Sequence, residues 1–258
     1  PGMDQAAFWA RSGLAAMFRP KGGDPVMLRT AFGDHVASLA IVAAVMAAVY
    51  ERLATGKGRL IDASLLRTAH YAGSSDLAIQ HTRGRIASNR PRQNAPNPLI
   101  NYFQTGGGRW ISLLQRQGEK DWTKLARALK VEHLVDDPRF ANGRVRRENG
   151  AELVQLLDEA FAAREFDDIA AALDAEEMIW APVLTAAEAI ADPQAIAAGC
   201  VVQTPKHDGG VMNAPAGPVR FPGADDGPKG PSPRAGEHTH AVLAEAGFSA
   251  AEIDAMYK

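Results

Sequence analysis

The sequence predicts an α/β protein with an inserted, smaller α+β domain. Strand-like and helical segments alternate over residues 1–85, and a β-hairpin pattern followed by several helices fills residues 86–200. Residues 201–258 form a loop-rich connector that ends in two helices. This order is typical of the α/β class, and 46% hydrophobic with 22% charged residues is the composition of an ordinary folded protein. We therefore expect three parts, 1–85, 86–200 and 201–258.

The first part is dominated by one long apolar helix. Residues 4–18 predict a strand or a short helix that ends near Gly13, and the Gly- and Pro-rich stretch RPKGGDPV predicts turns. Residues 35–54 are Ala-rich, polar only near their ends and followed by TGKG, which predicts a helix buried on nearly all sides. Its apolar run, Leu39 to Tyr50, is too short to cross a bilayer. RLIDASL then predicts a short strand, and a helix follows to about Gln80.

The middle part begins after a basic stretch, RGRIASNRPRQNAPNP, which predicts a domain boundary. Two β-rich runs around TGGGR predict a hairpin over residues 99–114. Helices are expected at about 119–130, 148–163 and 165–176. One stripe at helical spacing should face the core; it consists of Leu153, Leu156, Leu157, Ala160 and Phe161.

The last part returns through a strand-like WAPVL and a helix with Pro193 inside or beside it. Residues 201–236 predict a connector with little helix and a few short strands. Two terminal helices follow, and Ser249 and Glu252 have the spacing of a capping box.

Composition gives no support for several classes of function. A net charge of −2 gives no reason to expect nucleic acid or a membrane surface as partner. A single cysteine, Cys200, predicts a reduced, cytoplasmic setting. His238 and His240 do not face the same way on a helix, so no metal site is expected. Because the chain starts without Met, we expect a fragment, one polypeptide of a split protein, or a protein with its front removed.

Asp34 is the strongest chemical candidate, although its neighbours alone favour a plain role. It follows Gly33 and precedes the long helix, which is the position of a helix N-cap. A carboxylate at a helix start is favoured in its charged form, and a charged carboxylate can attack an activated acyl group. The cap and the nucleophile are therefore compatible interpretations.

Several motifs in order resemble the class III CoA-transferases, the family of formyl-CoA and carnitine-CoA transferases. The central signature is AFGDHVASLAIVAAVMAAVYERLATGKGRLIDASLLRTA, with Gly33-Asp34 before a small-residue helix, then Arg52, TGKG and DASLL. NPLINYFQTGGGRWISL resembles the family's hairpin and DDPRFANGRVRRENGAELVQLLDEAF its helical small domain. WAPVLTAAEAIADPQA and GEHTHAVLAEAGFSAAEI resemble the segment leading back and the closing helices. The similarity runs from Asp4 almost to Lys258 and covers the later two-thirds of the family; its Rossmann-like N-terminal portion has no counterpart here.

The resemblance implies a CoA-transferase that moves CoA from an acyl-CoA donor to a carboxylic acid through an anhydride and a thioester on Asp34. Residues 1–85 would be the remainder of a Rossmann-like, CoA-binding large domain, into which the small domain is inserted. Gly33, His35, Arg90 and Arg92 are candidate substrate-binding residues. CoA serves as substrate, no metal or redox cofactor is required, and an interlocked homodimer is expected.

Two alternatives remain. The related α-methylacyl-CoA racemases use a histidine in a GHD motif, where this chain has Gly2-Met3-Asp4, and methionine cannot act as an acid or base. The racemase interpretation thus lacks one of its two groups, and a transferase is favoured. The other alternative is a non-catalytic or partner-dependent chain that binds the missing portion.

Overall fold

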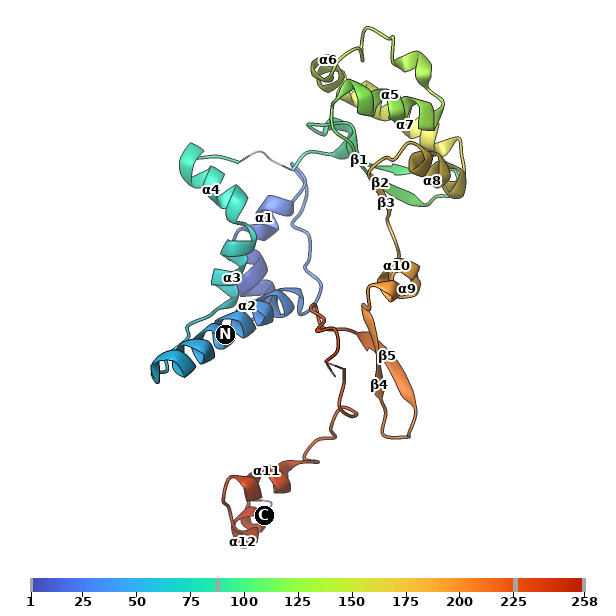
Figure 1. Ribbon diagram of the computed structural model, residues 1–258. Coiled ribbons are helices and arrows are strands. Elements are labelled where there is room, and N and C mark those ends of the chain that lie inside the picture. The colour runs from blue at the N-terminus through green and yellow to red at the C-terminus, as the bar shows by residue number, and fades with distance from the viewer. Residues whose placement is uncertain (1, 87–88, 225–226, 257–258) are drawn as a thin grey trace. The chain divides into compact units, whose positions relative to one another are not determined.

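The structure is a computed structural model that describes residues 2–86, 89–224 and 227–256 (Figure 1). The chain divides into two compact units, Pro1–Pro182 and Val183–Lys258. Each unit combines helices with an antiparallel sheet, so the mixed class expected from the sequence is confirmed. The three-part division and the relation to a Rossmann-like domain stay predictions.

The first unit starts with a group of helices. These are the π-helix η1 (Asp4–Ala10), α1 (Leu14–Phe18), α2 (Phe32–Thr55), α3 (Leu65–Ala72) and α4 (Ser74–Arg83). The segment 4–18 is thus helical, and Gly13, at φ 91°, separates its two helices. Phe8, Trp9, Leu14 and Ala69 form a small buried cluster between η1, α1 and α3.

The predicted strand over RLIDASL is wrong. Residues 57–64 have no regular secondary structure, and Ser64 instead caps α3 by accepting a hydrogen bond from the Arg67 amide. A strand is stable only beside a partner, and none of the described segments pairs with these residues. The apolar residues of this stretch therefore did not suffice to specify a strand.

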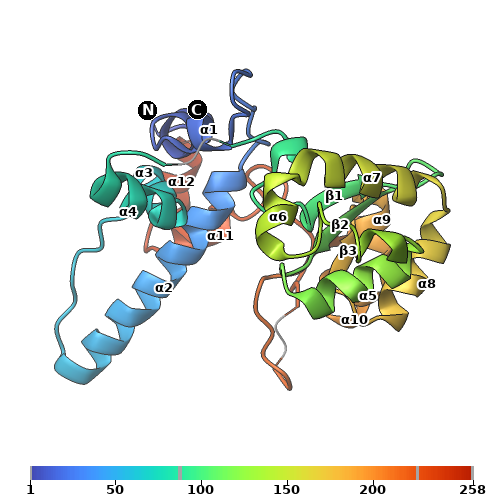
Figure 2. The ribbon, with the colours of Figure 1, turned by 90° about the horizontal axis from the view of Figure 1, so that it is seen from above.

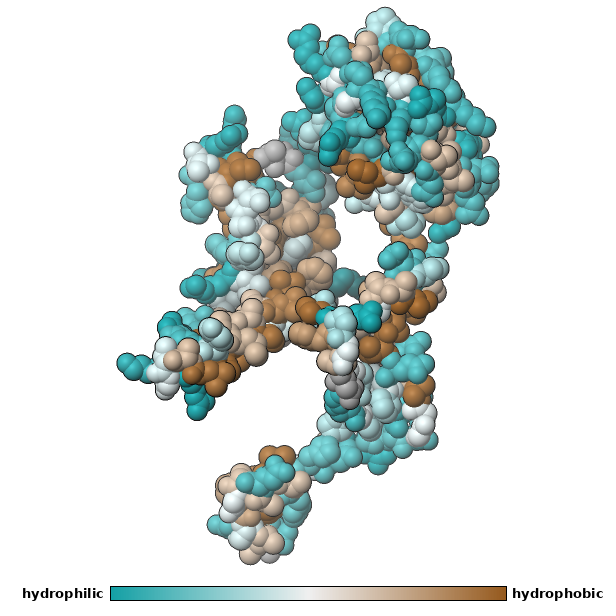
Figure 3. All heavy atoms as spheres, in the orientation of Figure 1, coloured by the Kyte–Doolittle hydropathy of each residue, from teal (hydrophilic) through white to brown (hydrophobic). Residues whose placement is uncertain are grey.

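The long helix α2 is confirmed, but its expected burial is wrong. Among its residues only Gly33 and Ala37 are buried, because η1 and α3 pack against one side of its start. Figure 3 shows apolar surface along this helix. Its exposed apolar side chains are Leu39, Ile41, Val42, Val45, Met46, Val49, Tyr50 and Leu53. The run from Leu39 to Tyr50 is too short to cross a bilayer, but the whole helix of 24 residues is long and apolar enough to do so by length and composition, a test that core helices of soluble proteins pass as well.

The rest of the first unit is an α+β body. Its antiparallel sheet has the order β1 (Ile100–Gln104), β2 (Trp110–Leu114), β3 (Trp180–Pro182), and the predicted hairpin is confirmed. Helices η2 (Arg92–Asn94), α5 (Glu119–Leu129), η3 (Glu132–Leu134), α6 (Gly143–Glu148), α7 (Gly150–Ala162) and α8 (Phe166–Ala175) complete it (Figure 2). Leu153, Leu157 and Phe161 are fully buried, which confirms the predicted core stripe.

The second unit has short elements and little core. It comprises α9 (Ala186–Ala191), α10 (Pro193–Ala197), the hairpin β4 (Val201–Pro205) and β5 (Val211–Pro215), α11 (Thr239–Glu245) and α12 (Ala250–Ala255). Pro193 lies at the start of α10, and the capping box of Ser249 and Glu252 is present, as predicted. Of its described residues, only Ile253 is buried.

Candidate functional site

Asp34 lies in the first turn of α2, but not at its N-cap. The helix begins at Phe32 after Ala31, so Asp34 is its third residue and the predicted capping role is wrong. The chain turns earlier than expected because the Phe32 amide donates to the Arg29 carbonyl at 3.3 Å and the His35 amide to the Ala31 carbonyl at 3.0 Å. A carboxylate in the first turn still lies at the positive end of the helix dipole. The Asp34 side chain is exposed there.

Gly33 joins this turn to η1. Its amide donates to both carboxylate oxygens of Asp4, at 3.2 and 3.3 Å. A Cβ atom on Gly33 would overlap Asp4 Oδ1 and the ring of Phe8, so only glycine fits between the two elements. Gly33 is buried for this reason.

Two further residues of η1 bind the segment that leads into α2. Gln5 Oε1 accepts a hydrogen bond from the Leu28 amide at 3.2 Å, and Trp9 Nε1 donates to the Val26 carbonyl at 2.7 Å. Phe8, at 2% exposure, packs in the buried cluster beneath them. The position of Asp34 is therefore defined from two directions, by its helix and by η1.

Few backbone amides at the start of α2 remain open. The amides of Phe32, Gly33 and His35 have the partners given above. From Val36 onward the helix itself uses each amide. Within the described part of the chain, the Asp34 amide is the one in this turn that has no hydrogen-bond partner.

His35 follows Asp34 on the helix and is exposed. Its backbone carbonyl accepts a hydrogen bond from the Ser38 hydroxyl at 2.7 Å. Nothing in the structure assigns its ring a task, and its role in substrate binding stays a prediction.

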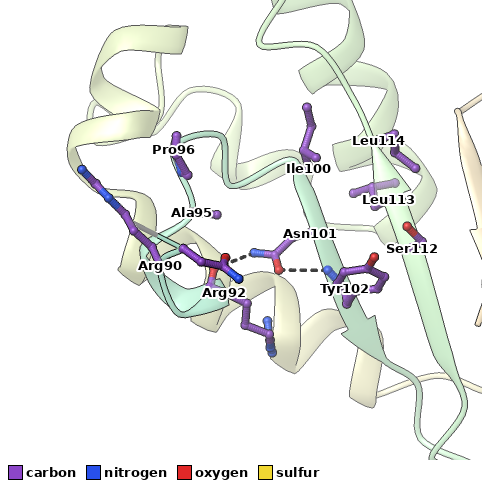
Figure 4. Close-up of a pocket in the computed structure, with 11 residues that line it drawn as sticks. Arg90, Arg92, Ala95, Pro96, Ile100, Asn101, Tyr102, Ser112, Leu113 and Leu114 are labelled. Atoms are coloured by element: carbon purple, nitrogen blue, oxygen red, sulfur yellow. Dashed lines mark hydrogen bonds between the residues drawn. The ribbon is translucent and has the colours of Figure 1, made fainter. Parts of the chain in front are cut away.

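Arg90 and Arg92 lie elsewhere, beside the three-stranded sheet. Both line a hollow of about 440 Å³ over β1 and β2, together with Ile100, Tyr102 and Ser112 (Figure 4). The side chain of Arg90 extends away from Tyr102 and Ser112 in that view. No hydrogen bond or ion pair among the described residues joins either arginine to Asp34.

The side chain of Arg92 forms an ion pair with Asp158. Its Nη2 donates to both carboxylate oxygens of Asp158, at 2.5 and 2.6 Å, and the guanidinium lies 5.7 Å from the ring centres of Phe103 and Trp110. Burial raises the pKa of Asp158 above its ordinary value, and the charge of Arg92 opposes that shift. Arg90, by contrast, is exposed.

Sequence reasoning missed the contribution of η1. The sequence shows Asp4 only within Gly2-Met3-Asp4, and its contact with Gly33 spans 29 residues. No local spacing signals such a contact. The described residues contain no group of three or more His, Cys, Asp or Glu that could hold a metal ion.

Comparisons with known proteins agree on one family. (R)-2-hydroxy-4-methylpentanoate CoA-transferase of Clostridioides difficile is 28% identical over 256 residues, which cover 98% of this chain and 63% of that protein. The succinyl-CoA:glutarate CoA-transferase of Mus musculus is 25% identical, with 92% of this chain and 54% of that protein covered. A solved CAIB/BAIF family protein from Brucella suis matches with a TM-score of 0.79 and 26% identity, over 92% of this chain and 61% of that one.

The chain spans less than two thirds of the length of these relatives. The model of the family described as CoA-transferase family III matches residues 1–239. The chain belongs to CoA-transferase family III.

Proposed function

We propose that this chain carries the catalytic carboxylate of a CoA-transferase, and that this carboxylate is Asp34. The observation that carries the proposal is the exposed carboxylate at the positive end of a helix, on a turn fixed by a second element, in a chain of CoA-transferase family III. Relatives named as CoA-transferases support the reaction class, and no comparison favours a racemase over it.

The proposed reaction uses Asp34 twice. Its carboxylate oxygen attacks the thioester carbon of the donor acyl-CoA, the C–S bond breaks, and CoA leaves as the thiolate. The thiolate then attacks the Asp34 carbonyl carbon of the mixed anhydride, which releases the donor acid and leaves a thioester on Asp34. The acceptor carboxylate attacks that thioester, its C–S bond breaks, and the thiolate is released from a mixed anhydride of Asp34 and the acceptor. The thiolate finally attacks the acceptor acyl carbon of this anhydride, the C–O bond to Asp34 breaks, and acceptor-CoA and the Asp34 carboxylate are formed.

Each attack places negative charge on a carbonyl oxygen, which a nearby N–H donor stabilises. The open amide of Asp34 is our candidate for this donor. It lies at the start of a helix, where the dipole also favours negative charge. The amides of Gly33 and His35 already have partners, and those of Val36 and Ala37 bond within the helix.

For the substrates we propose an acyl-CoA donor and a carboxylic acid acceptor, with Arg90 as the cation that contacts an anionic group of one of them. Arg90 is exposed beside the hollow, whereas two contacts with Asp158 hold Arg92. His35 is the candidate for contacts near the nucleophile. A homodimer and a cytoplasmic setting remain part of the proposal.

The decisive experiment traps the intermediate on Asp34. The protein is incubated with an acyl-CoA and hydroxylamine, which converts an activated aspartyl carbonyl into a hydroxamate, and peptides are analysed by mass spectrometry. We expect the hydroxamate on Asp34, and we expect oxygen-18 from a labelled acceptor carboxylate to appear in Asp34. Asp34→Asn should lower turnover by about 1000-fold or more, because it removes the nucleophile that the protein supplies.

A matched control is Asp76→Asn. Asp76 is the third residue of α4, as Asp34 is of α2, so the same chemical change occurs at the same helix position. This variant should keep its activity. Turnover by Asp34→Asn at the wild-type rate would exclude the proposal.

Two further assays separate the alternatives. α-Hydrogen exchange with deuterium in a 2-methylacyl-CoA, without transfer, would indicate a racemase. Activity that appears only with a second polypeptide, identified by intact-mass spectrometry, would indicate a partner-dependent chain.

A further inference from the structure

The helix that carries the proposed nucleophile has no cap of its own. A preferred N-cap side chain accepts a hydrogen bond from the second or third amide of its helix. The N-cap of α2 is Ala31, in the left-handed conformation at φ 63°, and its methyl group cannot accept one. Gly33 is the second residue of the helix, and its amide is the group that such a cap would bind.

Asp4 fills this role from a different element. Both of its carboxylate oxygens lie within 3.3 Å of the Gly33 nitrogen, and Asp4 opens η1, 29 residues earlier in the chain. The carboxylate also places a negative charge at the positive end of the helix, which is favourable. The bond therefore fixes the residue directly before Asp34.

The contact leaves little room for movement. On one side of Gly33 lie Asp4 Oδ1 and the ring of Phe8, so close that a Cβ atom would overlap both. Phe8 is buried, and Gln5 and Trp9 hold the segment that precedes α2. A π-helix such as η1 is rare in proteins and frequently occurs at functional sites.

We propose that Asp4 is a positioning residue of the transferase reaction, which rests on the function proposed above. By accepting the Gly33 amide, it sets the orientation of the first turn of α2 and thus the approach of the Asp34 carboxylate to the thioester. The Asp34 amide remains the open donor of that turn. The role requires an acceptor oxygen, not a proton or a charge, at position 4.

The test compares Asp4→Ala with Asp4→Asn. Alanine removes the acceptor, and a displacement of the nucleophile by about 1 Å costs about 100-fold in rate, so kcat should fall by roughly that factor while KM for the acyl-CoA stays within about threefold. Asparagine keeps an acceptor oxygen and should restore most of kcat. Asp192→Ala is the control, because Asp192 caps a helix of the second unit, α10, by accepting the Ala195 amide at 3.0 Å.

Hydrogen exchange gives a readout that does not depend on activity. The Gly33 amide should exchange faster in Asp4→Ala than in the wild-type protein, and at the wild-type rate in Asp4→Asn. Unchanged exchange or unchanged kcat in Asp4→Ala overturns the proposal, and so does an Asp4→Asn variant as slow as Asp4→Ala. Activity of Asp34→Asn would instead refute the proposed function, so the two failures are distinguishable.

Discussion

Because Gly33 has no side chain, η1 and the start of α2 can pack in close contact. Substitution by alanine would place a methyl group against Asp4 Oδ1 and the Phe8 ring. Over-packing of this kind costs about 1–3 kcal/mol in the free energy of unfolding. If η1 moved away from α2 to remove the overlap, the hydrogen bond from the Gly33 amide to Asp4 would break. We expect Gly33→Ala to lose both stability and turnover, as measured by urea unfolding and by the transfer assay.

Gly217→Ala is the control for that substitution. A Cβ atom on Gly217 meets no atom within 4 Å, and this glycine is not among those with positive φ. Its stability should stay within about 0.5 kcal/mol of the wild type, as for most surface changes. Equal stability of the two variants would contradict the close fit around Gly33.

At this scale the sequence located the nucleophile candidate but not its surroundings. Asp34 could be identified because Gly-Asp before an Ala-rich helix is a local pattern. The position of Asp34 within the helix could not be predicted, because no sequence pattern indicates the left-handed conformation of Ala31 or the turn that begins at Arg29. Asp4 could not be assigned to Gly33 because only tertiary packing brings them together.

Among the elements, α6 is tied to the start of α5 by one buried cation. Arg146 is fully buried, and its guanidinium donates to Gln117 Oε1, the carbonyls of Gln117 and Phe140, and both carboxylate oxygens of Glu119, at 2.8 to 3.1 Å. Arg146→Met removes these donors and leaves the buried Phe140 carbonyl and the half-buried Gln117 carbonyl without this partner. We expect a loss of roughly 3 kcal/mol in the free energy of unfolding, measured in urea.

The same contact predicts a pH dependence. The hydrogen bond from Arg146 holds the pKa of Glu119 below its ordinary value. Because the folded-state pKa is lowered, this stabilisation is present above the unfolded pKa of about 4.3 and is lost as the pH falls through the folded value. The stability gap between the wild type and Glu119→Gln should therefore narrow as the pH falls below about 4.

Glu148→Gln is the matched control for this pH series. Glu148 forms an exposed i,i+4 pair with Arg144 at 3.6 Å, and such pairs contribute little. Its stability gap to the wild type should stay small over the same pH range. A gap that changes as much as that of Glu119→Gln would show that general charge effects, not the Arg146 contact, cause the dependence.

Element prediction succeeded where the pattern was local and failed where it was not. The hairpin, the α7 stripe and the Ser249 capping box follow from alternation, helical spacing and cap chemistry. RLIDASL has strand-forming residues, yet a strand also requires a neighbour, which its own sequence does not specify. The burial of α2 likewise depends on which segments pack against it, and the apolar composition of a helix does not determine its packing partners.

On the scale of the whole molecule, the two units differ in how much they bury. The α+β body of the first unit has a core with residues such as Phe103, Trp122 and Leu157, whereas Ile253 is the only buried residue described in the second. Amides with few buried contacts around them exchange through low-energy local opening. In the monomer, peptides from 183–256 should therefore exchange far faster than those of β1 and α7.

Hydrogen exchange of the second unit also provides a test of the proposed homodimer. If a second copy covers the second unit, its protection should rise with protein concentration, while that of β1 stays constant. Light scattering measured in parallel gives the mass of the species. Low protection at every concentration, together with a monomer mass, would exclude the homodimer.

The hydrogen bond between Asp4 and Gly33 bears on how members of the family are identified from sequence motifs and on where their chains can be truncated. A chain that lacks residues 1–10 would keep the sequence signature of the family from Gly33 to Leu66. A motif search would still identify it as a transferase. Such a chain would retain Asp34 but lack the carboxylate that accepts the Gly33 amide, and we expect it to be much slower than the intact chain. If the proposed role of Asp4 holds, a search for transferases in this family should therefore require both the segment around Asp4 and the segment from Gly33 to Leu66.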